Sequence, residues 1–253
     1  MQQYQSFARC YDRFMENVDY GQWLCRLKHL WEEAGFTPKT LLEFGCGTGN
    51  FTLPLARQGY QITGVDLSEE LINQAKQKAQ KEQLSVTFEV EDICDYQAQQ
   101  EVDGVLCLCD TINYLTEPED VQEAFFAAAD AVKEGGFFLF DVNTPYRFAK
   151  VYGSQTFSFV AEDAAYIWEN SYDPQEQINT YDVHFFLRRP DGTYDRREEV
   201  HEERAYPQLT LTVMLENAGF TVCSMTGETG NEATQTDQRW TFLAVKERSN
   251  GDE

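Results

Sequence analysis

The sequence is poor in basic residues. Its 253 residues include 20 lysines and arginines against 43 aspartates and glutamates, which gives a formal net charge of −23 at pH 7. A phosphate backbone is repelled by such a chain unless its few basic residues cluster, so the composition disfavours nucleic-acid partners. Solubility is the simplest interpretation of the acidity, and a cationic or amine substrate is compatible with it.

Patterns for disulfides, metals and membranes are also missing. The seven cysteines are scattered without a Cys-x-x-Cys pair, and there are three histidines. These counts argue against a disulfide framework or a zinc site, and no metal site is predicted. No window approaches the ~18 consecutive apolar residues of a membrane helix. The first residues, Met1-Gln-Gln-Tyr4, lack the basic and apolar parts of a signal peptide, so we expect a cytoplasmic protein with no membrane partner.

The chain does contain a glycine-rich segment, Leu41-Leu-Glu-Phe-Gly-Cys-Gly-Thr-Gly-Asn50. Thr40 to Phe44 is short, apolar and β-prone, as a strand inside a parallel sheet should be. Gly45, Gly47 and Gly49 follow it, and glycine lacks the Cβ that would hold a ligand away from the backbone. A strand, a glycine loop and a helix N-terminus together predict a nucleotide site at the carboxyl end of a sheet.

The spacing of this segment departs from the dinucleotide fingerprint, which has glycine at its first, third and sixth positions. Here the sixth position is Asn50, and Glu43 stands two residues before the first glycine. Glu-x-Gly-x-Gly-x-Gly resembles motif I of the class I S-adenosylmethionine-dependent methyltransferases. The resemblance implies that S-adenosyl-L-methionine is the cofactor and that Glu43, Gly45, Cys46 and Gly47 bind it.

The second predicted strand, Tyr60 to Asp66, ends on a carboxylate. In the resembled family a carboxylate there accepts hydrogen bonds from both ribose hydroxyls, which assigns Asp66 and the following Leu67 to the cofactor. Asp66 could instead cap the next helix, predicted over residues 69–83. Ser68 is better placed for that role, with Glu69 and Glu70 in the first turn.

The third and fourth predicted strands end beside further candidates. After residues 85–90, Asp92 and Ile93 match the family positions that bind the adenine amino group and pack on its ring, although Asp92 alone would be a turn residue. The fourth strand, residues 102–109, ends where the family places the sulfonium and the substrate. The candidates there are Asp110 as a catalytic and cofactor-binding residue, Tyr114 as a catalytic residue and Asn113 as a substrate-binding residue. The alternative is that Asp110 caps the loop and Asn113 turns it.

Residues 4–34 are predicted to be helical, with an aromatic face. Tyr11-Asp12, followed by Asp19-Tyr20, resembles the N-terminal signature of bacterial small-molecule methyltransferases. By that resemblance Tyr11 touches the methionine end of the cofactor, and Tyr20 is a substrate candidate. Packing in the core is the alternative for Tyr11.

The alternation of predicted strands and helices stops between Tyr146 and Ala205. Residues 156–160, 165–172, 178–188 and 193–204 are predicted as strands of an inserted antiparallel sheet, which we expect to be a lid, a dimer interface or both. His184 alternates with Asp182 and Phe186 on the face opposite Tyr181. If that face met the cofactor, His184 could act as a base or orient the acceptor.

The predicted fold is therefore α/β, a doubly wound Rossmann-like seven-stranded sheet whose last strand is antiparallel, with an inserted antiparallel β-sheet after strand five. The expected units are a helical cap (1–38), the cofactor-binding domain (39–145 and 206–247), the insertion (146–205) and a polar tail (248–253).

The resemblance implies methyl transfer to nitrogen or oxygen of a small-molecule acceptor by direct displacement. Three alternatives stay open. RNA or protein acceptors would be favoured by a basic surface around Arg188, Arg189, Arg196 and Arg197. A nicotinamide-dependent oxidoreductase is opposed by Asn50 and by the terminal strand pair. A binding protein or dimeric scaffold would hold the cofactor without catalysis.

Overall fold

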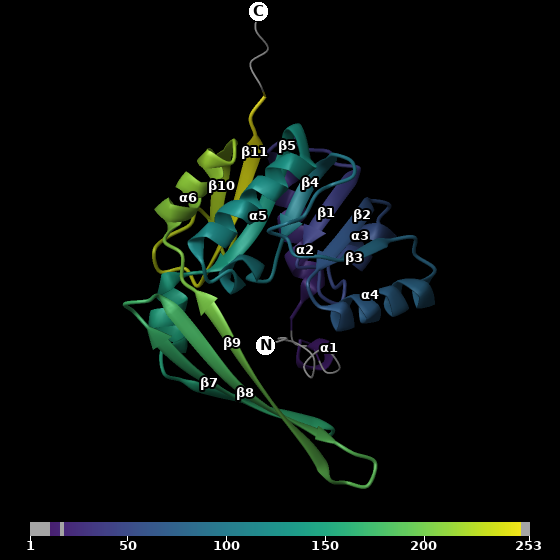
Figure 1. The fold of residues 1–253 in the computed structure, drawn as a ribbon, viewed down its shortest axis with the longest axis vertical. Coiled ribbons are helices and arrows are strands. Elements are labelled where there is room, and N and C mark those ends of the chain that lie inside the picture. Colours follow the sequence, from purple (N-terminus) through teal and green to yellow (C-terminus); the bar gives the residue numbers. More distant parts are fainter. Residues whose placement is uncertain (1–10, 16–17, 249–253) are drawn as a thin grey trace, which may run out of the picture.

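The computed structural model describes residues 11–15 and 18–248. A seven-stranded sheet carries helices on both faces, and a four-stranded sheet projects from it as a second lobe (Figure 1). The predicted fold class, including the inserted sheet, is confirmed. Within the described residues, no helix is both long enough and apolar enough to cross a membrane.

The seven-stranded sheet has the order β10-β11-β5-β4-β1-β2-β3. The central strand β1 pairs in parallel with β2 and β4, while β11 runs antiparallel between β5 and β10. The sheet is therefore parallel except for its last strand, as expected. Its strands are β1 Thr40–Phe44, β2 Gln61–Asp66, β3 Thr87–Val90, β4 Val102–Cys107, β5 Val132–Asn143, β10 Phe220–Gly227 and β11 Arg239–Lys246.

Helices cover both faces of this sheet. The face with α2 and α3 and the face with α5 and α6 each bury a separate apolar cluster. Burying one such side chain contributes roughly 1.5–3 kcal/mol, which makes the sheet a rigid platform for the loops at its edge. The helical elements of this part are α2 Tyr20–Glu33, α3 Thr52–Arg57, α4 Glu69–Glu82, the 3₁₀ turn η1 Thr111–Tyr114, α5 Pro118–Ala131 and α6 Gln208–Asn217.

Helix α4 begins as predicted. The hydroxyl of Ser68 accepts a hydrogen bond from the Leu71 N–H, so Ser68 rather than Asp66 caps the helix. Its buried side chains recur at helical spacing on one face: Leu71, Ile72, Ala75 and Ala79.

Helix α5 is shorter than the sequence suggests. Its apolar stripe and the glycines at 135 and 136 predict an end at Glu134, but the helix stops at Ala131 and β5 starts at Val132. Val132 pairs with Val102 of β4, so sheet pairing prevails over the glycine signal here.

The N-terminal segment is also interrupted. Instead of one helix over residues 4–34, the described part has a short α1, Tyr11–Phe14, and then α2. Asp19 causes the break, because its side chain accepts a hydrogen bond from the Gln22 N–H (2.8 Å) and caps α2. The predicted role of Tyr11 concerns a side chain outside the described residues, as do residues 4–10.

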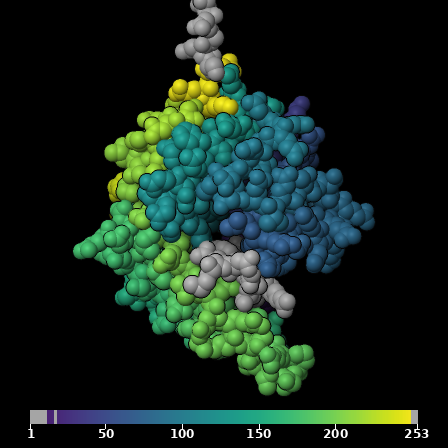
Figure 2. Space-filling view, in the orientation of Figure 1, coloured from purple at the N-terminus to yellow at the C-terminus, as the bar shows by residue number. Residues whose placement is uncertain are grey.

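The inserted sheet is an antiparallel meander of β6 Thr156–Val160, β7 Ala164–Asp173, β8 Ile178–Arg188 and β9 Tyr194–Arg204. A π-helical segment, η2 Arg147–Tyr152, connects it to β5. Figure 2 shows this sheet, in green, projecting from the α/β part. One of its faces turns inward, where Phe14 of α1 packs against Phe159, Tyr166 and Phe185.

Candidate functional site

The glycine loop after β1 has a backbone that only glycine adopts easily. Gly45, Gly47 and Gly49 all have positive φ, at 65°, 54° and 81°. A Cβ on Gly45 would lie 2.4 Å from the Thr111 hydroxyl, so this glycine lets the loop pack against η1. A Cβ on Gly47 would meet nothing within 4 Å. The backbone at Gly47 is therefore open to a ligand, which fits an adenosyl cofactor approaching this loop.

Asp66 lies at the end of β2, beside that loop. One carboxylate oxygen accepts a hydrogen bond from the Gly47 N–H (2.8 Å) and the other from the Ser68 N–H (2.9 Å). Burial raises the pKa of the Asp66 carboxyl, and these two hydrogen bonds oppose the increase. The following Leu67 is 70% exposed, an apolar side chain available to cover a ligand. Asp66 therefore lies at the strand end beside the glycine loop, and its contact with a ribose stays a prediction.

Glu43 and Cys46 point into the protein. Glu43 is 2% exposed and accepts a hydrogen bond from the Thr52 hydroxyl. Burial raises the pKa of Glu43 to about 8, so the carboxyl is mostly neutral at pH 7. Cys46 is buried, and its sulfur would be 2.8 Å from a Cβ on Gly64. The backbone of Cys46, and not its side chain, is therefore the part available to a ligand at the loop.

Asp92 and Ile93 follow β3 at the same edge. One oxygen of Asp92 accepts a hydrogen bond from the Cys94 N–H (2.9 Å), which is the turn role that its sequence position suggests on its own. Ile93 is 7% exposed and packs in the core. A contact of either residue with adenine stays a prediction.

Helix α1 is tied to the glycine loop by a polar cluster that no sequence motif predicted. Asp12 accepts hydrogen bonds from the hydroxyl of Thr48 (2.6 Å) and the amide of Asn50 (3.2 Å). Lys78 of α4 forms an ion pair with Asp12 at 2.9 Å and donates to Thr48 and Asn50. The N-terminal segment therefore lies directly beside the candidate cofactor loop.

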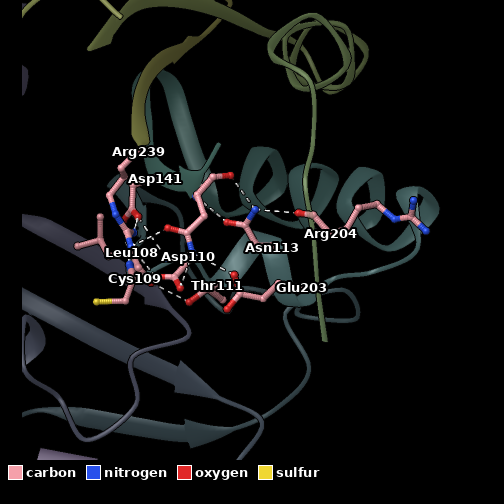
Figure 3. A network of polar contacts seen from close by, with 10 residues as sticks. Leu108, Cys109, Asp110, Thr111, Asn113, Asp141, Glu203, Arg204 and Arg239 are labelled. Carbon is pink, nitrogen blue, oxygen red and sulfur yellow. Dashed lines mark hydrogen bonds and ion pairs between the residues drawn. The ribbon is translucent and has the colours of Figure 1, made fainter. Parts of the chain in front are cut away.

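Beyond β4 the chain makes a sharp turn. Cys109 and Asp110 both have left-handed backbones, with φ of 57° and 55°, and their N–H groups donate to the two oxygens of Asp141. Such strain in consecutive non-glycine residues is typical of functional sites. Arg239 of β11 bridges the acids, pairing with Asp141 and, at 2.9 Å, with Asp110 (Figure 3).

Asn143, at the end of β5, connects this turn to the inserted sheet. Its amide nitrogen donates to Asp110 (3.0 Å) and to Glu203 of β9 (3.0 Å). Two carboxyl groups from different sheets thus share one amide. Asn113 supports the arrangement by exchanging hydrogen bonds with the Asn143 backbone and donating to the Arg204 carbonyl.

A cavity of about 200 Å³ lies between this turn and the inner face of the inserted sheet. Its floor contains the acids Asp110 and Glu203, and most of its walls are aromatic. The lining residues are Phe14, Met15, Cys109, Asp110, Tyr114, Tyr152, Tyr166, Trp168, Tyr181, Val183, Phe185, His201 and Glu203.

The cavity brings together some of the predicted acceptor-side residues and leaves out others. Asp110 and Tyr114 line it. Asn113 does not, because its side chain is fully buried in backbone hydrogen bonds. Tyr20 does not either, since its ring packs edge-on against Phe51 in the α2 face of the sheet.

The choice of histidine needs correction. His184 lies on the opposite face of β8 from Tyr181, among Glu169, Asp182 and Glu198. The face that meets the core is the Tyr181 face, so His184 is turned away from the cavity. His201 of β9 lines it instead, with its ring edge-on to Tyr114. Sequence reasoning also missed Glu203, Asn143 and Arg239, because nothing local marks them.

The described residues contain no group of three or more metal-ligating side chains that could hold an ion. Three of the four arginines that would have favoured an RNA acceptor are paired with acids. Arg189 and Arg197 contact Asp195 at 2.6 and 3.3 Å, and Arg196 pairs with Glu198. These pairs reduce the positive charge that the hairpin between β8 and β9 presents.

Known proteins share this architecture. A family model described as a methyltransferase domain matches residues 41–136. YqeM of Bacillus subtilis (strain 168), provisionally named a methyltransferase, is 34% identical over 250 residues, covering 97% of this chain and 98% of its own. The crystal structure of an S-adenosylmethionine-dependent methyltransferase from Clostridium acetobutylicum ATCC 824 is 28% identical, with a TM-score of 0.87 over 97% of this chain and 99% of that one.

A more distant structure shares the fold alone. The sugar N-methyltransferase KedS8 from Streptoalloteichus sp ATCC 53650 is 19% identical, with a TM-score of 0.75 over 94% of this chain and 93% of its own. The relatives matched over nearly their whole length and the family model agree on one family, and they support S-adenosylmethionine as its cofactor. The chain belongs to the class I S-adenosylmethionine-dependent methyltransferases.

Proposed function

We propose that the protein transfers a methyl group from S-adenosylmethionine to a nitrogen or oxygen atom of a small molecule that occupies the cavity between the two sheets. The observation that carries this proposal is the position of the cavity. It starts at Cys109 and Asp110, at the end of β4, and is closed by the inner face of the inserted sheet. Ligands of open α/β sheets bind at the carboxyl ends of the strands.

The cofactor would lie along the neighbouring loops of the same edge. Asp66 would accept the ribose hydroxyls, Asp92 and Ile93 would meet the adenine, and the backbone at Gly45 and Gly47 would approach the methionine part. Helix α1, held to the loop by Asp12, would exclude water from one side. When bound, S-adenosylmethionine supplies an electrophilic methyl group on a sulfonium.

The reaction asks little more of the protein than alignment. Holding an acceptor atom in line with a methyl group can contribute roughly 7–11 kcal/mol to catalysis. The rigid β4 turn and the aromatic walls of the inserted sheet are suited to that task. Exclusion of water from an apolar cavity also removes a competing nucleophile.

A small acceptor fits these features better than a macromolecule. The cavity is lined on several sides and measures about 200 Å³, and Arg189, Arg196 and Arg197 of the β8–β9 hairpin are paired with acids. KedS8, which is described as a sugar N-methyltransferase and has the same fold, is consistent with a small acceptor.

The test is a methyl-transfer assay with S-adenosylmethionine labelled on the methyl group, offered to a panel of small amines, phenols and alcohols, and separately to RNA and protein. Val183 lines the cavity, so Val183→Trp is expected to fill it and abolish transfer while S-adenosylhomocysteine still binds. Asp182→Asn, on the other face of the same strand, is the matched control and should keep full activity. Transfer to RNA or protein that survives Val183→Trp would contradict the proposal.

A further inference from the structure

The cavity carries an excess of acid. Asp110 and Glu203 both line it, and each accepts a hydrogen bond from the same Asn143 amide at 3.0 Å. Arg239 is shared between Asp110 and a second buried acid, Asp141, and the charge of Arg147 also acts on Asp110 and Glu203. Two guanidinium groups thus face three carboxyl groups.

Glu203 is the unusual member of this group. It is 2% exposed, yet it stands at the cavity wall. Burial raises the pKa of Glu203 well above the usual range of a carboxyl, and the negative charge of Asp110 raises it further. Hydrogen bonds from Asn143 and Tyr181 and the charge of Arg147 oppose the increase. A cation entering the cavity would favour the ionised form.

Three aromatic rings stand beside these acids. The ring centroid of Trp168 lies 5.3 Å from that of Tyr152 and 5.2 Å from that of Tyr181, and the two tyrosine centroids are 5.9 Å apart. All three residues line the cavity. The Trp168 indole N–H is buried without a hydrogen-bond partner. A cluster of aromatic faces next to carboxyl groups is the chemistry that holds an alkylated ammonium ion.

We infer that the methyl acceptor is an amine, held with its nitrogen between the aromatic cluster of Tyr152, Trp168 and Tyr181 and the Asp110–Glu203 pair, and that Glu203 receives its proton. This inference rests on the proposed function, because it specifies the acceptor of that same cavity.

The step balances in protons and electrons. A primary or secondary ammonium ion that enters the cavity favours release of the Glu203 proton to solvent. It then gives one of its own protons to the resulting carboxylate and becomes a neutral amine. The nitrogen lone pair then forms a bond to the methyl carbon, and the pair of the carbon–sulfur bond passes to sulfur, leaving S-adenosylhomocysteine. The product is a methylated ammonium ion, which the aromatic rings and Asp110 stabilise. A base with a raised pKa suits this transfer near neutral pH.

The same geometry opposes an anionic nucleophile. A phenolate or carboxylate oxygen would lie against Asp110 and Glu203, and like charges at close range are repelled strongly away from water. Arg147 offsets part of this repulsion, because its charge acts on Glu203 and on Asp110. Its guanidinium lies 4.8 Å from the centroid of the Tyr152 ring, and it is not among the lining residues.

Binding of a fixed cation tests the inference without knowledge of the true acceptor. The protein, saturated with S-adenosylhomocysteine, is titrated calorimetrically with choline and with its neutral isostere, in which carbon replaces the ammonium nitrogen. We expect choline to bind at least about tenfold more tightly than the isostere. Glu203→Gln should reduce that preference. Glu202→Gln, at the exposed neighbouring position of β9, should retain it.

The outcomes separate the inference from the proposed function. Equal binding of the two probes, tighter binding of the isostere, or no binding of choline at millimolar concentration overturns the amine inference. Trp168→Leu removes an aromatic face and should also reduce the preference, which covers the case in which Glu203→Gln does not fold; Trp168→Phe keeps the face and should keep the preference. In a turnover assay with matched amines and alcohols, transfer to alcohols alone contradicts the inference and leaves the proposed function intact. No transfer to any small molecule by protein that binds S-adenosylmethionine contradicts the proposed function itself.

Discussion

The two sheets of this protein differ in how their faces are used. The seven-stranded sheet is covered on both sides: Phe44 and Val105 on one face and Phe137 on the other have no exposed surface. The four-stranded sheet turns one face to the cavity and leaves the other to solvent, where Val160 is 81% exposed. The seven-stranded sheet presents backbone loops at its edge to a ligand, whereas the four-stranded sheet presents side chains on one face.

This difference separates two tasks. The candidate cofactor contacts come from short loops and from the strand-end carboxylate Asp66, which the rigid sheet holds in place. The candidate acceptor contacts are mostly aromatic side chains of β7 and β8, which can change without disturbing the sheet behind them. We therefore expect changes at the edge of the large sheet to affect stability or cofactor binding, and changes on the inner face of the small sheet to affect the acceptor.

The largest expected effect concerns the buried carboxyl of Glu43. Its pKa rises from 4.5 to about 8 on folding. The native state therefore binds the proton more tightly than the unfolded state, and this contribution is complete below pH 4.5 and is lost as the pH rises through about 8. The shift corresponds to roughly 5 kcal/mol. Urea unfolding from pH 5 to 9 should show wild type losing stability relative to Glu43→Gln; parallel curves for the two proteins would contradict this.

The second effect concerns packing of the glycine loop. Gly45→Ala places a methyl group 2.4 Å from the Thr111 hydroxyl and forces a left-handed alanine, so it should destabilise the protein by about 2 kcal/mol. Thr111→Ala in the same chain removes the clash but not the backbone strain, and should restore part of the loss. Denaturant midpoints of the three proteins measure this. A Gly45→Ala variant as stable as wild type would remove the packing argument.

The smallest of these effects is confined to the acceptor. Trp168→Ala should raise the KM for the acceptor about tenfold, because an aromatic wall of the cavity is lost. The affinity for S-adenosylhomocysteine should stay the same. Ile167→Ala changes the adjacent residue, which is on the outer face and 39% exposed, and should leave both quantities unchanged. Equal losses in both variants would mean that the inner face has no special role.

The sequence predicted the large sheet well because its signals are local. The strand at residues 40–44, the positive-φ glycines and the cap at Ser68 each follow from a few adjacent residues, and all are confirmed. The predicted end of α5 at Glu134 was wrong, because the pairing of Val132 with Val102 depends on a contact between distant parts of the chain.

The cavity was harder to predict for the same reason. Alternation along β8 separates His184 from Tyr181, but the pattern alone does not tell which face meets the core. Arg239 reaches Asp110 across 129 residues of chain, and Glu203 reaches Asn143 across 60. Only the folded chain brings these partners together.

The central claim is that the edge formed by the glycine loop and Asp66 binds the adenosyl cofactor. It is tested most directly by calorimetric titration of the purified protein and of Asp66→Ala with S-adenosylhomocysteine, S-adenosylmethionine and NADH. We predict micromolar binding of both adenosyl ligands to wild type, clear weakening in Asp66→Ala, and no binding of NADH. A folded wild-type protein that binds neither adenosyl ligand, or an Asp66→Ala variant that binds them as tightly as wild type, would contradict the account.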